Sequence, residues 1–150
     1  MITLIKKMFQ SDQAKQSRPA ESEMKKQIAA CVLLLEVAHA DDECSQAEMA
    51  HIVDTVRKKF GLSPEYTAEL IELAQQERQN SVDLWQFTNY LNQQLSKDEK
   101  MAILDDVWRI IFTDGHLEMD EDHLVHKLAN LLRLTHKELI DAKLKAKAGC

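Results

Sequence analysis

Turn-forming residues are scarce in this chain, which contains three Gly and two Pro among 150 residues. The strands of a sandwich or barrel are joined by many tight turns, and those turns depend on Gly and Pro. Leu, Ala, Glu, Lys and Gln are abundant instead, and these residues favour helices. The sequence therefore predicts an all-α protein, and its length suffices for one compact domain with a substantial core.

Helix starts are marked by a recurring pair, a Ser or Thr followed three residues later by Glu, in which side chain and backbone cap each other. The pairs are Ser45–Glu48, Ser96–Glu99 and Thr135–Glu138, and Ser63 before Pro64 is a further start signal. Apolar residues at helical spacing follow each start. They predict a compact bundle of about seven helices, over residues 22–40, 46–60, 64–79, 81–95, 97–112, 119–133 and 136–147.

The apolar positions predict which helices pack most tightly. Cys31 lies in the apolar stripe of the first helix and is expected in the core, while the fifth helix is expected to be the most buried. The aromatic and leucine positions of the fourth helix are expected to be packing anchors; these are Trp85, Phe87, Tyr90 and Leu91.

Two acidic stretches resemble each other 73 positions apart, residues 39–48 and residues 112–121. Leu62-Ser63 also matches Leu134-Thr135, at an offset of 72. The repeat therefore predicts an internal duplication of a unit made of a helical hairpin and a third helix. The two halves would cover about residues 24–79 and 97–147, with the fourth helix as a connector, inside a single domain over residues 22–150.

Residues 1–21 are expected to be a flexible or weakly amphipathic N-terminal segment. Apolar residues within 1–9 leave open a weak contact with a membrane or a partner; they include Ile2, Ile5, Met8 and Phe9. The segment lacks the hydrophobic region and cleavage site of a signal peptide. The longest apolar run, residues 29–35, is far shorter than a membrane span.

Charge and cysteine content exclude several classes of protein. The formal net charge is -6, whereas proteins that bind nucleic acid through phosphates cluster Lys and Arg, so no nucleic-acid partner is expected. The three Cys contain no CxxC pair, which argues against a disulfide framework or a thiolate zinc site and favours the cytoplasm.

The acidic stretches are candidates for a cation site, because nine of the 25 acidic residues fall within residues 41–48 and 114–122. Asp41 and Asp114 follow helix C-termini, where free carbonyls already make the surroundings negative. Calcium, magnesium and manganese prefer such oxygen ligands, and zinc is less favoured. We therefore predict a divalent-cation site formed by Asp41, Glu48, Asp114 and Glu121 if the two bends approach each other.

Simpler explanations stay open for part of this set. Glu48 is accounted for by its capping pair, and acidic residues are favourable in any first helical turn. Glu121 has Glu118 at the corresponding position, so it cannot form the same pair. An EF-hand is excluded because its required Gly and final Glu are absent at both bends.

Other chemistry has weaker support in the sequence. His123 and His126 lie on one helix face and leave open a histidine zinc site, although no HExxH motif accompanies them. Cys44 near His39 is a candidate catalytic nucleophile, but the neighbouring acids disfavour the thiolate form that a nucleophile needs. A phosphate-binding Gly-rich loop is absent, so no machinery for nucleotide hydrolysis is expected.

The two acidic bends and the stretch from Glu121 through Leu134 together resemble the TerB-like, tellurite-resistance-associated proteins, over roughly residues 24–147. The resemblance implies an all-helical fold with internal duplication, in a bacterial cytoplasmic or membrane-associated setting. It also implies divalent-metal binding by acids at the bends, here Asp41, Glu48, Asp114 and Glu121, and a link to metal or chemical stress.

Sequence and resemblance together lead to one functional hypothesis, a non-catalytic interaction domain that responds to a divalent cation and binds a protein partner. The alternative is a metal-independent structural adaptor that binds a protein partner or a membrane-associated complex. Under either hypothesis, the protein is expected in the cytoplasm or at the periphery of the inner membrane. A metal-dependent hydrolase is a third class, without specific support in the sequence.

Overall fold

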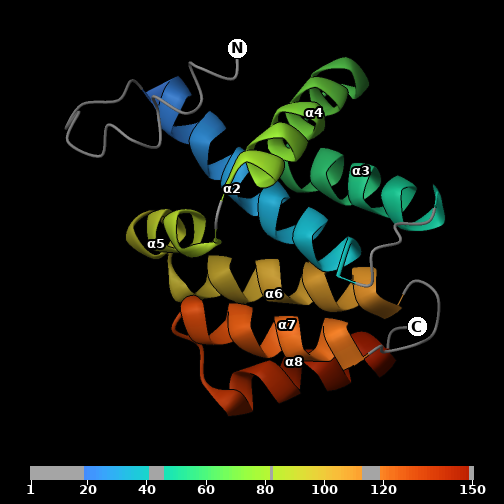
Figure 1. The fold of residues 1–150 in the computed structure, drawn as a ribbon, viewed down its shortest axis with the longest axis vertical. Helices are drawn as coiled ribbons and strands as arrows, with labels where there is room; N and C mark the ends of the chain where they lie inside the picture. The colour runs from blue at the N-terminus through green and yellow to red at the C-terminus, as the bar shows by residue number, and fades with distance from the viewer. Residues whose placement is uncertain (1–18, 41–45, 82, 113–118, 149–150) are drawn as a thin grey trace.

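The computed structural model describes residues 19–40, 46–81, 83–112 and 119–148. These residues form seven helices and no strand, as the all-α prediction requires (Figure 1). The helices are α2 (Pro19–Ala38), α3 (Gln46–Phe60), α4 (Pro64–Asn80), α5 (Trp85–Gln94), α6 (Lys97–Ile111), α7 (Met119–Leu131) and α8 (His136–Ala148). None of the helices in the described ranges is long and apolar enough to cross a membrane.

Helix α2 forms the centre of the fold. Every residue from Ile28 to Leu35 is at most 3% exposed, and α2 contacts α3, α4, α5, α6 and α7. A helix buried on all sides has apolar residues around its whole circumference. The prediction that the fifth helix, α6, is the most buried was therefore wrong. Cys31 lies in this core as predicted, and burial raises the pKa of its thiol to about 12.

Helices α6, α7 and α8 form a layer next to α2 (Figure 1). The side chain of Trp108 on α6 is fully buried, and its ring stacks on that of Phe112 with 5.7 Å between centroids. Asn92 joins α5 to this layer by donating to the Leu131 carbonyl (2.9 Å), and within the layer Lys100 of α6 donates to the Leu132 carbonyl (2.8 Å). These donors satisfy carbonyls that have no partner within α7 itself.

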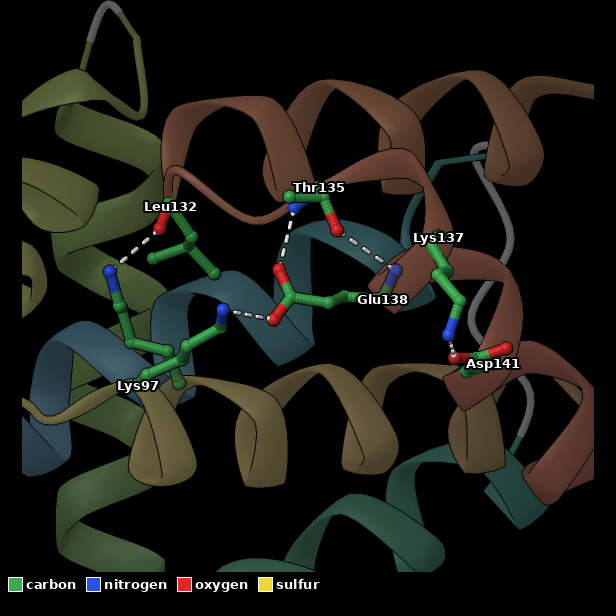
Figure 2. A network of polar contacts seen from close by, with 7 residues as sticks. Lys97, Leu132, Thr135, Lys137, Glu138 and Asp141 are labelled. Carbon is green, nitrogen blue, oxygen red and sulfur yellow. Dashed lines mark hydrogen bonds and ion pairs between the residues drawn. The ribbon is translucent and has the colours of Figure 1, made fainter.

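The predicted helix caps are present wherever both members are described. At the start of α6, Ser96 Oγ accepts a hydrogen bond from the Glu99 backbone, and Glu99 accepts one from the Ser96 backbone. Thr135 and Glu138 form the same pair at the start of α8, as Figure 2 shows. Ser45, the predicted partner of Glu48, lies outside the described residues.

Two helix ends have the same left-handed geometry. Gly61 after α3 and Arg133 after α7 have φ angles of 63° and 60°. In both turns an amide closes back over six residues, from Leu62 to Arg57 (3.0 Å) and from Leu134 to Ala129 (2.9 Å). This bond is the Schellman motif, which satisfies carbonyls at a helix end. The turns explain the Leu-Ser and Leu-Thr match at an offset of 72, while duplication of the whole unit stays a prediction.

The connection between α4 and α5 differs from the prediction. Ser81 does not start the fourth helix; its hydroxyl donates to the Glu77 carbonyl (2.7 Å) and it ends α4. Just before α5, Asp83 Oδ1 accepts a hydrogen bond from the amide of Trp85, the first residue of that helix (2.9 Å). Trp85 is 59% exposed, so the prediction that it anchors the core was wrong, whereas Phe87, Tyr90 and Leu91 are buried.

The first helix also begins earlier than predicted, at Pro19 instead of after Ser22. Proline is favourable in the first turn of a helix because its fixed φ angle is already helical and its missing N–H is not needed there. The described chain therefore enters the helical fold at a proline that the sequence prediction assigned to the N-terminal segment.

Candidate functional site

Two of the four predicted metal ligands are described, and both are buried. Glu48 lies in the first turn of α3 and is 7% exposed, and Glu121 lies in the first turn of α7 and is 2% exposed. Carboxylates are rarely buried to this extent in proteins unless they are paired or bind a cation. The prediction from sequence thus identified two acids that the fold withdraws from solvent.

The local structure explains part of this burial. The first turn of a helix has free N–H groups and a partial positive charge, which favour a carboxylate. Each glutamate is the third residue of its helix, and Val125, one turn after Glu121, is fully buried and directs that face of α7 toward the core. The position of each glutamate in the first turn of its helix therefore accounts for part of its burial.

The other two predicted ligands, Asp41 and Asp114, lie outside the described residues. Among the residues that are described, no three His, Cys, Asp or Glu side chains converge as a metal site would require. The four-residue cation site therefore stays a prediction.

The helix ends that flank the two bends lie on one side of the molecule, toward the right in Figure 1. They are the C-terminal ends of α2 and α6 and the N-terminal ends of α3 and α7. Helix α2 contacts both α3 and α7, and α6 contacts both as well. The fold thus directs the two first turns that carry Glu48 and Glu121 toward the same region.

The histidines proposed for zinc have other surroundings. His126 Nδ1 lies 2.8 Å from the Asp122 carbonyl oxygen, and its ring lies 5.9 Å from that of His136. His123 is exposed on α7. At the end of α2, His39 Nδ1 lies 2.8 Å from the Leu35 carbonyl oxygen, so this ring is held against its own helix.

One buried ion pair was not predicted from the sequence. Asp106, in the middle of α6, is buried and lies 3.1 Å from Lys59 Nζ on α3 and 3.4 Å from Arg109. An acid between the apolar residues Ile103 and Val107 was the available signal, because a charge on a buried helical face needs a partner. Its partner, 47 positions away, is brought close only by the fold.

The fold and these residues define a class: an all-helical domain with a buried central helix and with a buried acid in the first turn of each of two helices that follow acidic stretches of sequence. The family model described as tellurite resistance protein TerB matches residues 27–144. The chain belongs to this TerB family. The match agrees with the range over which the sequence motifs were recognised, and a comparison with curated proteins gave no significant match.

A solved structure has a similar fold. It is a protein of unknown function from Porphyromonas gingivalis W83, with a TM-score of 0.63 and 16% sequence identity. The similarity covers 83% of this chain and 89% of the other. At this identity the likeness concerns the fold, so the two proteins share the helical arrangement over most of their lengths.

Proposed function

We propose that this chain is a non-catalytic interaction domain that binds a divalent cation at its two acidic bends and presents a protein-binding surface in response. The burial of Glu48 and Glu121 in the first turns of α3 and α7 is the observation that supports it best. Calcium, magnesium or manganese would draw its remaining ligands from Asp41 and Asp114.

A buried acid and an exposed apolar side chain are close together at the start of α7. Met119 is 84% exposed and lies two residues before Glu121. Methionine is adaptable and is favoured at surfaces that bind several partners. A cation bound beside Glu121 would change the position of this first turn. The exposure of Met119 to a partner would then depend on whether the cation is bound.

The test is a calorimetric titration of chelator-treated protein with calcium, magnesium, manganese and zinc, together with the melting temperature at each metal concentration. We expect binding of at least one of the first three metals and a rise in melting temperature, because a ligand that binds only the folded state stabilises it. No heat and no change in melting temperature at millimolar metal would refute the proposal.

Variants locate the site. Glu48→Gln and Glu121→Gln keep side-chain size but lose the charge, and each should weaken binding about tenfold or more. Asp54→Asn is the matched control, since Asp54 is an acid of α3 that pairs on the surface with Lys58 at 3.0 Å. Melting curves without metal separate lost binding from lost folding. Equal weakening in the control would indicate general charge attraction instead of a site.

The partner test distinguishes the metal-independent adaptor. Methionines labelled at the methyl group report on Met119 during the metal titration, and its signal should shift with the same midpoint as the heat. If protein partners are captured equally well with chelator and with metal, the adaptor is the correct function. Residues 1–9 are proposed as a secondary membrane contact, tested by sedimentation with anionic vesicles.

A further inference from the structure

A polar cavity of about 330 Å³ lies between α2, α7 and the turn that joins α4 to α5. Four charged residues line it: Glu36 of α2, Arg78 in the last turn of α4, Asp83 before α5 and Lys127 of α7. The cavity therefore contains two cationic and two anionic side chains, contributed by segments that are far apart in the sequence.

The guanidinium of Arg78 is incompletely bonded. It forms an ion pair with Glu36, at 3.7 Å between Nη1 and Oε2, which is longer than a hydrogen bond. Within the described residues, Arg78 Nε is buried and has no hydrogen-bond acceptor. A buried N–H without an acceptor is unfavourable, but Nε is itself enclosed, so the donors that a ligand can reach are the terminal N–H groups of the partly exposed guanidinium.

The wall beside Arg78 is fixed by hydrogen bonds. The Ser81 hydroxyl donates to the Glu77 carbonyl and accepts from Gln86 Nε2 at 3.0 Å. Asp83 Oδ1 accepts a hydrogen bond from the Trp85 amide. Leu84 and Leu124 add apolar surface to the lining. The cavity thus combines hydrogen-bonded polar groups, an apolar portion and charged groups of both signs.

We propose that this cavity binds a small zwitterion of the amino-acid class, a compound with one carboxylate and one ammonium group. The planar guanidinium of Arg78 would bind the carboxylate through paired N–H donors. Glu36 and Asp83 would accept hydrogen bonds from the ammonium group. The apolar portion would contact an aliphatic side chain.

The charges on both sides of the cavity favour a zwitterion over a simple ion. A carboxylate or phosphate without a cationic group would bind Arg78 only by approaching Glu36, a like charge. An amine without a carboxylate would meet Arg78 and Lys127 in the same way. A zwitterion places each charge opposite its complement, and specificity arises from the repulsion of the alternatives. The inference is independent of the cation site.

The experiment is an NMR titration of the intact protein with L-alanine, L-leucine and L-glutamine, followed at backbone amides and at the indole of Trp85, which lies two residues after Asp83. Propionate and ethylamine are the controls that carry only one of the two charged groups. We expect saturable shifts at the cavity with at least one amino acid, and affinity at least about tenfold weaker for both controls.

Variants connect the binding to the proposed groups. Arg78→Gln should reduce the affinity about tenfold or more, and Arg78→Lys should reduce it less because the charge remains but the paired geometry is lost. Lys58→Gln is the control, because Lys58 is exposed on α3 outside the cavity. Melting curves verify that each variant folds.

Three results would overturn the proposal: propionate binding as tightly as the amino acids, an Arg78→Gln protein that folds and still binds with wild-type affinity, or no cavity shifts with any of the three amino acids. The amino-acid titration is carried out in the presence of a chelator. Its result therefore does not depend on whether the proposed cation site exists.

Discussion

The left-handed turns after α3 and α7 provide a reciprocal test of how this fold ends its helices. One turn carries Gly61 and the other Arg133, with φ angles of 63° and 60°. A residue with a side chain is strained in this conformation by about 1–2 kcal/mol, whereas Gly is not. Gly in turn costs about 0.5–1 kcal/mol because it loses more backbone freedom on folding.

At Gly61 the structure allows the change in the free energy of unfolding to be estimated from backbone terms alone. A Cβ placed there would have no atom within 4 Å outside its own neighbours, so steric overlap adds nothing. Strain minus the entropy gain predicts that Gly61→Ala lowers the free energy of unfolding by about 0.5–1 kcal/mol. Arg133 is exposed, so Arg133→Gly should raise the free energy of unfolding by a similar amount.

The assay is urea denaturation followed by circular dichroism, with equal m-values required for comparison. A change of this size moves the melting temperature of a 150-residue protein by about 2–3 °C. Ala50→Gly is the control for introducing Gly at an exposed helical position of α3, and it should destabilise. If Arg133→Gly destabilises as Ala50→Gly does, the strain argument is wrong.

Two further predictions concern charged groups. The ion pair with Lys97 (2.5 Å) and the backbone N–H of Thr135 lower the pKa of Glu138 from 4.5 to about 2. The ionised Glu138 therefore stabilises the folded protein fully above pH 4.5, and this stabilisation is lost as pH falls toward 2. Relative to Glu138→Gln, the wild-type protein should lose stability over that range, and parallel acid-denaturation curves would contradict this. Lys59→Met removes the shorter of the two ion pairs that Asp106 makes among the described residues, and it should cost about 2–3 kcal/mol in urea denaturation. The double variant Lys59→Met, Asp106→Leu should recover this stability. No recovery would show that the loss comes from packing around Lys59 instead of the unpaired charge.

Local chemistry made the helix ends predictable. Ser63, Ser96 and Thr135 each have a hydroxyl that caps a backbone N–H within three residues, so their effect requires no distant contact. Gly61 ended α3 for the same local reason. Ser81 failed as a start because a serine hydroxyl also bonds the carbonyl four residues earlier, as it does with Glu77. Sequence alone does not distinguish these two uses.

One of the two candidate sites was predictable from the sequence and the other was not. The acidic bends were visible because their residues are neighbours in the sequence, and the burial of Glu48 and Glu121 adds to that prediction. The zwitterion cavity had no sequence signal, because Glu36, Arg78 and Lys127 come from three separate helices. Their individual surroundings resemble ordinary surface positions until the helices pack.

The sequence by itself determined that this protein is helical, where most of its helices begin and end, and that many of its acids fall in two short stretches of the chain. Those properties depend on interactions within about one helical turn. Only the tertiary structure decided that α2 is central, that Trp85 is exposed, and that Lys59 meets Asp106. Such properties depend on which helical faces meet, and many arrangements of the same helices satisfy the same local rules.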